Sequence, residues 1–248
     1  VVEDVARLGG FGIAAHPDSP KDSLKWTAWS APFDALEWLN TDSEWRDEPV
    51  WHLASALITY PFRAPETLAR AFRRPSTLAL WDEALRHRRM IALAGSDAHG
   101  SLRLYEDGDP AAGHASIPVP SYEAMFRTAS VHVVLDRPLT GDASGDARSL
   151  LASVRSGHLH TVVDAAATPA SFSFTARSGA ESAIEGDTLS GVEPVWFRGR
   201  VNGPPGADIV LLRDGAEVHR TQTRELVYAS NRPGAYRVEV RLASGPAG

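Results

Sequence analysis

The stretch MIALAGSDAH, residues 90–99, joins a short apolar run to a polar loop that contains an aspartate and a histidine. The run MIALA has the length and composition of a buried strand, which Gly95 ends. In proteins whose strands alternate with helices, the carboxyl ends of the strands are where ligands and metals bind. The sequence therefore predicts that Asp97 and His99 lie at one edge of a sheet, beside a ligand or a metal.

Strand-like and helical patterns alternate over the first two thirds of the chain. Apolar runs predict strands at residues 11–15, 33–39, 90–94 and 131–135. Amphipathic stretches predict helices at residues 2–8, 64–74, 76–89, 121–129 and 146–157. Ser121 and Asp146 are expected to cap the last two helices, because each precedes a helical pattern with a short polar side chain. This alternation is typical of a parallel sheet or barrel, and we predict an α/β domain over residues 1–167.

The pattern changes after about residue 168, where short alternating segments replace the helices. They are expected to form strands at residues 171–176, 195–201, 208–213, 216–220 and 235–242. Asp214-Gly215 lies between two of them and predicts a tight hairpin turn. Several such strands separated by turn residues indicate a small β-sandwich, so we predict an all-β domain over residues 168–248 that packs against the first or binds a partner.

The composition excludes several kinds of site. Cysteine is absent, which rules out disulfides and thiolate metal ligands. The formal net charge is −6 at pH 7, so the overall charge does not indicate nucleic-acid binding. No apolar stretch is long enough to span a bilayer, and we expect no transmembrane segment. A small-molecule substrate is the partner we expect, while the compartment and the oligomeric state stay open.

A histidine follows the first predicted strand in the same way that Asp97 and His99 follow a later one. His16 comes directly after FGIAA, and Pro17 favours an extended backbone that presents its imidazole at the strand end. Two imidazoles and a carboxylate suit zinc, manganese or iron and need no thiolate. We therefore predict a divalent metal site made by His16, Asp97 and His99. His99 has an alternative role as a proton shuttle, because the sequence does not fix the orientation of its ring.

Other polar residues are candidates for contact with the metal ligands or with a substrate. Glu37 and Asn40 lie at the end of the second predicted strand, where they would hold a ligand or a loop in place. His114 lies in the loop that follows GSDAH and is a candidate for substrate contact. His158 and His160 form a His-x-His pair on a later strand, and we interpret them as partly exposed strand histidines. The alternative is a metal-binding pair in a permuted barrel.

Three segments together resemble the later part of a PHP-domain metallohydrolase, in the branch of the CehA/McbA-like hydrolases. These segments are GGFGIAAHP, FDALEWLN and LWDEALRHRRMIALAGSDAH. SLLASVRSGHLHTVVDA is similar to the last barrel segment of that family, and LLRDGAEV and PGAYRVEV are similar to the β-rich extension common in this branch. The resemblance covers nearly the whole chain.

The resemblance implies a fold, a metal site and a reaction. The expected fold class is α/β: the C-terminal part of a distorted (β/α)7 PHP barrel, followed by the small sandwich. Two or three metal ions would lie at the carboxyl ends of the strands, with His16, Asp97 and His99 among their ligands. The expected reaction is hydrolysis of phosphoester bonds, or of carbamate or ester bonds, by metal-activated water.

One family motif has no counterpart in this sequence. The early His-x-His motif of the family would precede Val1, so we expect this chain to be the C-terminal portion of a longer protein and to be inactive alone. The alternative function is that of a non-catalytic binding or scaffold module with a degenerate metal site. The identity of the substrate and of the metal is not fixed by the sequence.

Overall fold

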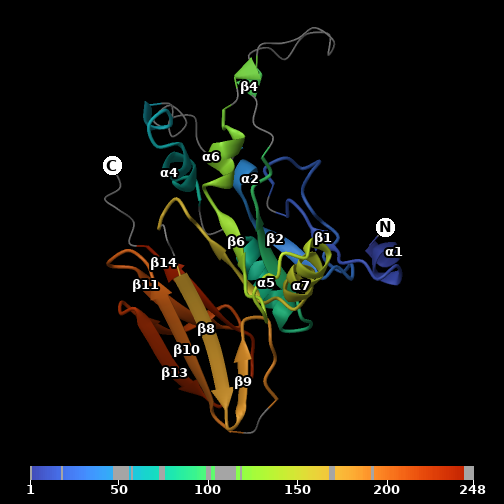
Figure 1. Cartoon of the computed structure of the whole chain (residues 1–248), viewed down its shortest axis with the longest axis vertical. Coiled ribbons are helices and arrows are strands. Elements are labelled where there is room, and N and C mark those ends of the chain that lie inside the picture. Colours follow the sequence, from blue (N-terminus) through green and yellow to red (C-terminus); the bar gives the residue numbers. More distant parts are fainter. Residues whose placement is uncertain are drawn as a thin grey trace.

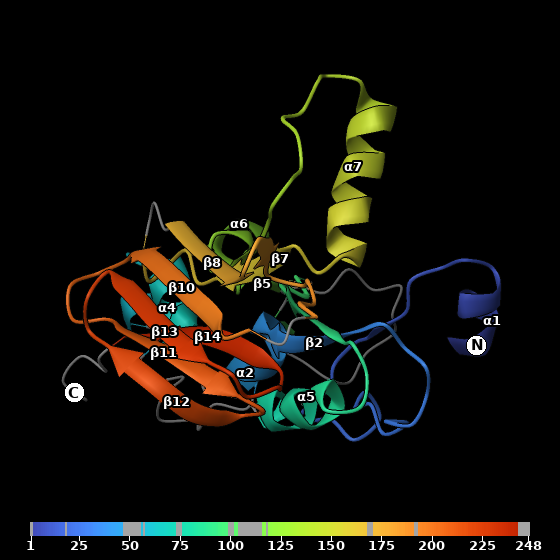
Figure 2. The ribbon, with the colours of Figure 1, turned by 90° about the horizontal axis from the view of Figure 1, so that it is seen from below.

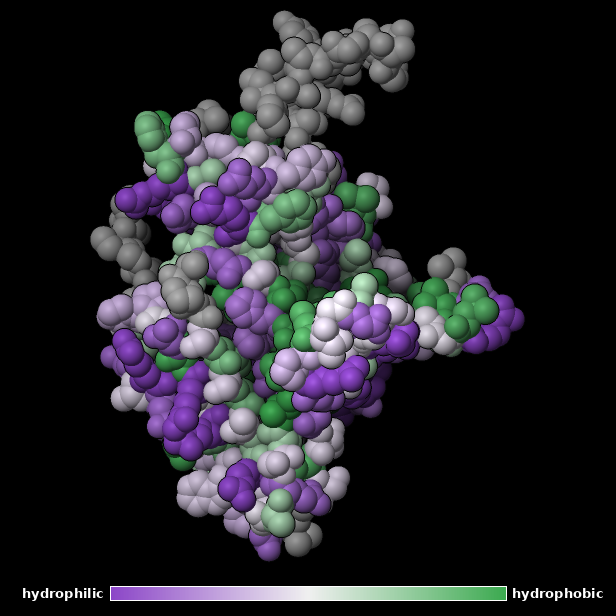
Figure 3. All heavy atoms as spheres, in the orientation of Figure 1, coloured by the Kyte–Doolittle hydropathy of each residue, from purple (hydrophilic) through white to green (hydrophobic). Residues whose placement is uncertain are grey.

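The computed structural model shows a part of mixed helices and strands joined to a β-rich part (Figure 1). It describes residues 2–17, 19–46, 56, 58–72, 76–98, 102–103, 116–117, 119–167, 171–190 and 193–242. On the face drawn in Figure 3, hydrophobic residues are interspersed with hydrophilic ones, as on the surface of most folded proteins.

A three-stranded parallel sheet forms the centre of the first part. Its order is β1 (Ile13–Ala14), β2 (Ala35–Asn40) and β3 (Ile91–Gly95). Most of β2 is buried, and Leu36 has no exposed surface, because both faces of the sheet are covered. Phe33, Met90 and Ala92 pack against Leu36 in one apolar core. The sheet therefore supplies a rigid base at whose carboxyl edge the candidate residues lie.

The helices of the first part are mostly short. They are α1 (Val2–Arg7), α2 (Thr41–Arg46), α4 (Ala64–Ala69), α5 (Thr77–Leu85), α6 (Tyr122–Phe126) and α7 (Ala143–Arg155). Helix α5 lies against the sheet, and the indole Nε1 of Trp81 donates to the carbonyl of Met90 at 2.9 Å. Ser121 caps α6 as predicted, because its Oγ accepts from the amide of Ala124 at 3.2 Å. Over the residues described, no helix combines the length and the apolar character needed to cross a membrane.

The predicted (β/α)7 barrel is wrong. The described strands form separate open sheets, and antiparallel pairing predominates. Strands β6 (Ser130–Val133) and β7 (Leu159–Val162) pair antiparallel in a two-stranded sheet. A second antiparallel pair joins β4 (Leu102–Arg103) to β5 (Ser116–Ile117). The β6–β7 sheet packs on the parallel sheet through side chains but does not extend it.

The connection between β6 and β7 explains this difference. A helix between two strands normally carries the chain back across the sheet, so that the second strand runs parallel to the first. Here residues 134–142 lead away from the sheet, and α7 brings the chain back, as Figure 2 shows. The helix has 13 residues and is thus about 20 Å long. Helix α7 thus brings the chain back to the end of β6, and β7 begins there and pairs antiparallel with β6.

The start of α7 also differs from the prediction. Asp142, not Asp146, is the capping residue, and its carboxylate accepts from the amide of Gly145 at 2.9 Å. Asp146 lies in the first turn and accepts from the amides of Thr140 at 2.9 Å and Gly141 at 2.8 Å. The hydrogen bond from Thr140 lowers the pKa of Asp146 and outweighs the opposing effect of desolvation. Asp146 therefore anchors the incoming loop to the helix.

Two antiparallel sheets make up the β-rich part, in agreement with the sandwich-like strands expected there. One has the order β13 (Glu225–Ser230), β10 (Val195–Asn202), β8 (Ser171–Ser178) and β9 (Glu181–Ile184). The other has the order β12 (Ala216–Thr221), β11 (Asp208–Arg213) and β14 (Tyr236–Arg241). Phe197, Ile209, Leu211 and Leu226 form the core between them. The turn at Asp214-Gly215 has φ angles of 50° and 82°, as the predicted tight hairpin requires.

A buried ion pair joins the two parts of the molecule. Arg237 of β14 donates from Nε and Nη2 to the two carboxylate oxygens of Asp82 in α5, at 2.6 and 2.7 Å. Both residues are less than a tenth exposed. Arg237 also donates to Glu239. Burial alone would raise the pKa of Glu239, but the hydrogen bonds from Arg237 and Arg241 lower it below its ordinary value. The guanidinium of Arg237 is thus held by carboxylates from both parts.

We predict that Arg237→Gln destabilises the protein by about 3–5 kcal/mol, because it leaves Asp82 buried without its cation. The measurement is the free energy of unfolding in urea. The control is Arg200→Gln, which removes an exposed guanidinium that pairs with the partly exposed Glu225, and should change that free energy by about 0–1 kcal/mol. An equal decrease in the free energy of unfolding in the two variants would show that the buried pair is no more important than the exposed one.

Asp146→Asn should lower the free energy of unfolding at pH 7, because the folded state depresses the pKa of this carboxyl. The ionised carboxylate of Asp146 stabilises the folded state at pH values above the ordinary pKa of 3.8. This stabilisation is lost as the pH falls through the lower pKa of Asp146 in the folded state. The difference between wild type and variant should therefore persist from pH 7 to about 4 and narrow at more acid pH. Urea unfolding at several pH values measures it, and Asp136→Asn, at an exposed position of the same loop, is the control.

Candidate functional site

Four of the predicted residues lie together at the carboxyl edge of the parallel sheet. His16 follows β1 by two residues, Glu37 and Asn40 lie on β2, and Asp97 follows β3 by two residues. The register places Asn40 opposite Gly95, so the ends of β2 and β3 coincide. Side chains that are far apart in the sequence therefore meet because parallel strands end at one edge.

The side-chain amide of Asn40 lies at the centre of this group. Its Nδ2 is 3.1 Å from Nδ1 of His16, and it donates to Oε2 of Glu37 at 3.0 Å and to Oδ2 of Asp97 at 3.3 Å. The amide oxygen accepts from the backbone of Ser43 at 2.8 Å, which fixes the orientation of the amide group. Asn40 is only 5% exposed, so its amide is shielded from solvent, while the side chains of His16 and Asp97 are each 27% exposed.

The imidazole of His16 lies between two carboxylates. Its Nδ1 is 3.5 Å from Oδ2 of Asp97 and 3.7 Å from Oε2 of Glu37. Glu37 also accepts from the backbone amide of His16 at 2.9 Å, which holds the loop after β1. Two ligands of one zinc ion, at bond lengths of about 2.0–2.2 Å, are themselves roughly 3–4 Å apart. The spacing and donor atoms of His16 and Asp97 therefore fit a pair of ligands to one ion.

A complete metal shell does not appear among the residues described. No group of three or more histidine, aspartate or glutamate side chains within them is arranged to hold a metal ion. Oε2 of Glu37 already accepts from His16 and Asn40, and this places Glu37 in a supporting position. The predicted ligand His99 and the substrate candidate His114 lie outside the described residues.

The backbone is strained at both proposed ligands. His16 has a φ of 53° and Asp97 a φ of 45°, in the left-handed region that residues other than glycine seldom adopt. Such a conformation costs on the order of 1–3 kcal/mol per residue and persists only where the surrounding structure holds it. Strained residues of this kind cluster at functional sites, because the strain keeps a side chain in one position. Both proposed ligands share this conformation, and both follow strands of the same parallel sheet.

Gly95 is required by the close approach of Glu37. A Cβ atom at position 95 would lie 1.8 Å from Oε1 of Glu37 and 2.9 Å from its Cδ. A side chain there would therefore force the carboxylate away from His16. The glycine of GSDAH thus makes room for the residue that supports the loop after β1, a role that strand pattern alone does not reveal.

The later His-x-His pair belongs to a different region. Nε2 of His158 lies 2.8 Å from Oδ1 of Asp187, and Nδ1 of His160 lies 3.1 Å from Oε1 of Glu185. Desolvation would raise the pKa of Asp187, but hydrogen bonds from Ile184 and His158 lower it below its ordinary value. These carboxylates lie just beyond β9, and the sequence analysis did not single them out. The pair contacts the β-rich part instead of the edge that holds His16.

In comparisons with known proteins, no family model, no curated protein and no solved structure matches this chain. Any function proposed for this chain therefore rests on its sequence motifs and on the geometry of the described residues.

We predict that Gly95→Ala displaces the Glu37 side chain and breaks its hydrogen bond with the amide of His16. The free energy of unfolding should fall by about 1–3 kcal/mol, the cost of leaving buried polar groups unpaired. Urea unfolding gives the energy, and a crystal structure of the variant gives the position of Glu37.

Gly199→Ala is the matched control, because it places alanine at another strand glycine. Its Cβ would lie 3.7 Å from the nearest atom, at ordinary contact distance. Alanine suits a strand better than glycine, so this variant should be as stable as the wild type or slightly more stable. If the side chain of Glu37 keeps its position in the Gly95→Ala variant, the steric argument is contradicted.

Proposed function

We propose that the edge formed by His16 and Asp97 is part of the metal site of a hydrolase that cleaves phosphoester bonds, or carbamate or ester bonds. The observation that carries the proposal is the 3.5 Å separation of Nδ1 of His16 from Oδ2 of Asp97, reached from two different strands. The resemblance of AHP and GSDAH to PHP-type metallohydrolases supports the same function. The metal would be zinc, manganese or iron, which imidazole and carboxylate ligands suit.

Each residue of the group has a distinct role in this proposal. His16 and Asp97 would hold the ion. Glu37 fixes the backbone of His16, and Asn40 holds the two carboxylates by donating to Oε2 of Glu37 and Oδ2 of Asp97. A bound divalent ion would supply a water molecule of lowered pKa and would polarise the bond to be cleaved. The strained, hydrogen-bonded arrangement of the ligands favours a geometry that is set before the ion arrives.

Metal binding by the purified protein tests the proposal. After treatment with a chelator, titration with zinc or manganese in a calorimeter should show saturable binding. His16→Ala and Asp97→Asn should each weaken it by roughly tenfold or more, since even residues that merely support a ligand contribute 10- to 100-fold. His87→Ala is the matched control, because this histidine also contacts a carboxylate, Glu83, but is 73% exposed.

Hydrolysis provides the second measurement. The metal-loaded protein is assayed with an aryl phosphomonoester, an aryl phosphodiester and an aryl carbamate, and His16→Ala should lower any turnover together with the metal content. Because the chain alone is expected to be inactive, the absence of turnover by itself does not contradict the proposal. A folded protein that takes up neither metal does contradict it. That outcome favours the alternative function, a non-catalytic binding or scaffold module.

A further inference from the structure

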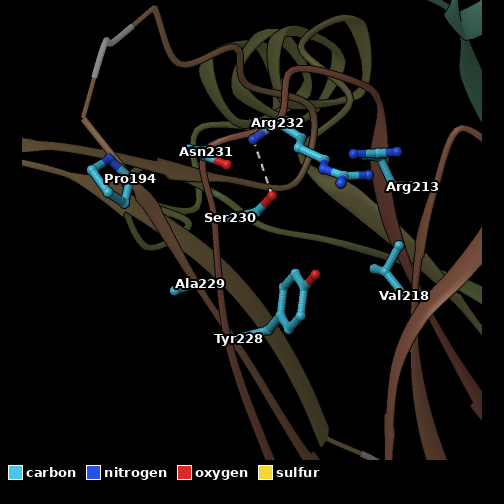
Figure 4. Close-up of a pocket in the computed structure, with 8 residues that line it drawn as sticks. All are labelled: Pro194, Arg213, Val218, Tyr228, Ala229, Ser230, Asn231 and Arg232. Atoms are coloured by element: carbon cyan, nitrogen blue, oxygen red, sulfur yellow. Dashed lines mark hydrogen bonds between the residues drawn. The ribbon is translucent and has the colours of Figure 1, made fainter.

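A pocket in the β-rich part has the composition of a site for a small anion. Its volume is about 550 Å³, and it lies where β11, β12 and β13 approach the loop that follows β13. Arg213 and Arg232 contribute two guanidinium groups, and Tyr228 and Val218 contribute apolar surface. Figure 4 shows the side chain of Arg232 extending toward Arg213. None of the described residues that line this pocket is acidic.

The guanidinium of Arg213 lacks a full set of partners. Its Nε is buried and has no hydrogen-bond acceptor among the described residues. The nearest carboxylate oxygen with which it pairs, Oδ2 of Asp214, is 3.8 Å away, which is too long for a hydrogen bond. The other oxygen of Asp214 accepts from the backbone amide of Ala235 at 2.8 Å. A buried donor without an acceptor, on an arginine that lies beside a second arginine, indicates a position for an external acceptor.

The loop that carries Arg232 is held in place by its own hydrogen bonds. The amide of Arg232 donates to Oγ of Ser230 at 3.1 Å. The hydroxyl of Tyr236 lies 2.8 Å from both Oγ of Ser230 and the carbonyl of Arg232. Figure 4 shows the hydroxyl of Tyr228 pointing into the space beneath Ser230. The backbone that carries Arg232 is thus fixed by the fold before any ligand is present.

We propose that this pocket binds a small organic anion through its carboxylate or phosphate group. Arg213 and Arg232 would bind the oxyanion, because a guanidinium presents paired donors that match carboxylate and phosphate oxygens. The apolar body of the ligand would lie on Tyr228 and Val218. This site is separate from the edge that holds His16 and Asp97, and it requires neither a metal nor catalysis.

Binding of benzoate and phenyl phosphate to the purified protein tests the proposal, with benzamide as the neutral analogue. Calorimetry at low salt should show saturable binding of at least one of the two anions and none of benzamide. Arg213→Gln and Arg232→Gln should each raise the dissociation constant at least tenfold. The anion with the lower dissociation constant identifies the group, carboxylate or phosphate, that the pocket prefers.

Arg224→Gln is the control variant, because Arg224 is an exposed arginine of the same part that does not line the pocket. It should leave the dissociation constant unchanged, and thermal unfolding should show that all three variants are folded. The absence of saturable binding of either anion overturns the proposal. If Arg224→Gln raises the dissociation constant as much as the two pocket variants do, the proposal is also overturned, because that result shows that the anion is attracted by overall charge.

Discussion

Parallel pairing of β1, β2 and β3 is the constraint on which the candidate site depends. Because the three strands run the same way, their carboxyl ends meet at one edge. Asn40 is the last residue of β2, and His16 and Asp97 each follow a strand by two residues, so the three side chains lie close together. The amide of Asn40 then links an imidazole to two carboxylates. The strain at His16 and Asp97 is on the order of 1–3 kcal/mol each, and this hydrogen-bond network opposes its release.

Local features of the fold could be predicted because each depends on a few neighbouring residues. The buried runs at 33–39 and 90–94 are strands, Ser121 is a cap, and Asp214-Gly215 is a tight turn. The approach of His16 to Asp97 could also be predicted, because both follow strands of one sheet. This last prediction required only that the two strands be parallel members of one sheet.

The barrel could not be predicted correctly, because strand periodicity does not reveal the direction in which a strand pairs. Residues 134–142 and α7 look like an ordinary crossover in the sequence, yet the loop and the helix together return the chain antiparallel. The cap of α7 was wrong for a related reason, since both Asp142 and Asp146 precede helical patterns and only the path of the loop decides between them. The role of Gly95 depends on a contact between strands that no local pattern contains.

The ion pair between Asp82 and Arg237 has a consequence for how this protein can change over time. Each charge is buried against a residue from the other part of the chain, 155 positions away. Recombination that exchanged the β-rich part for an unrelated one would leave Asp82 enclosed with no counterion, and the hybrid would be selected against. The two parts are thus expected to be inherited as a unit, and a change at either position should be tolerated only when the other changes with it.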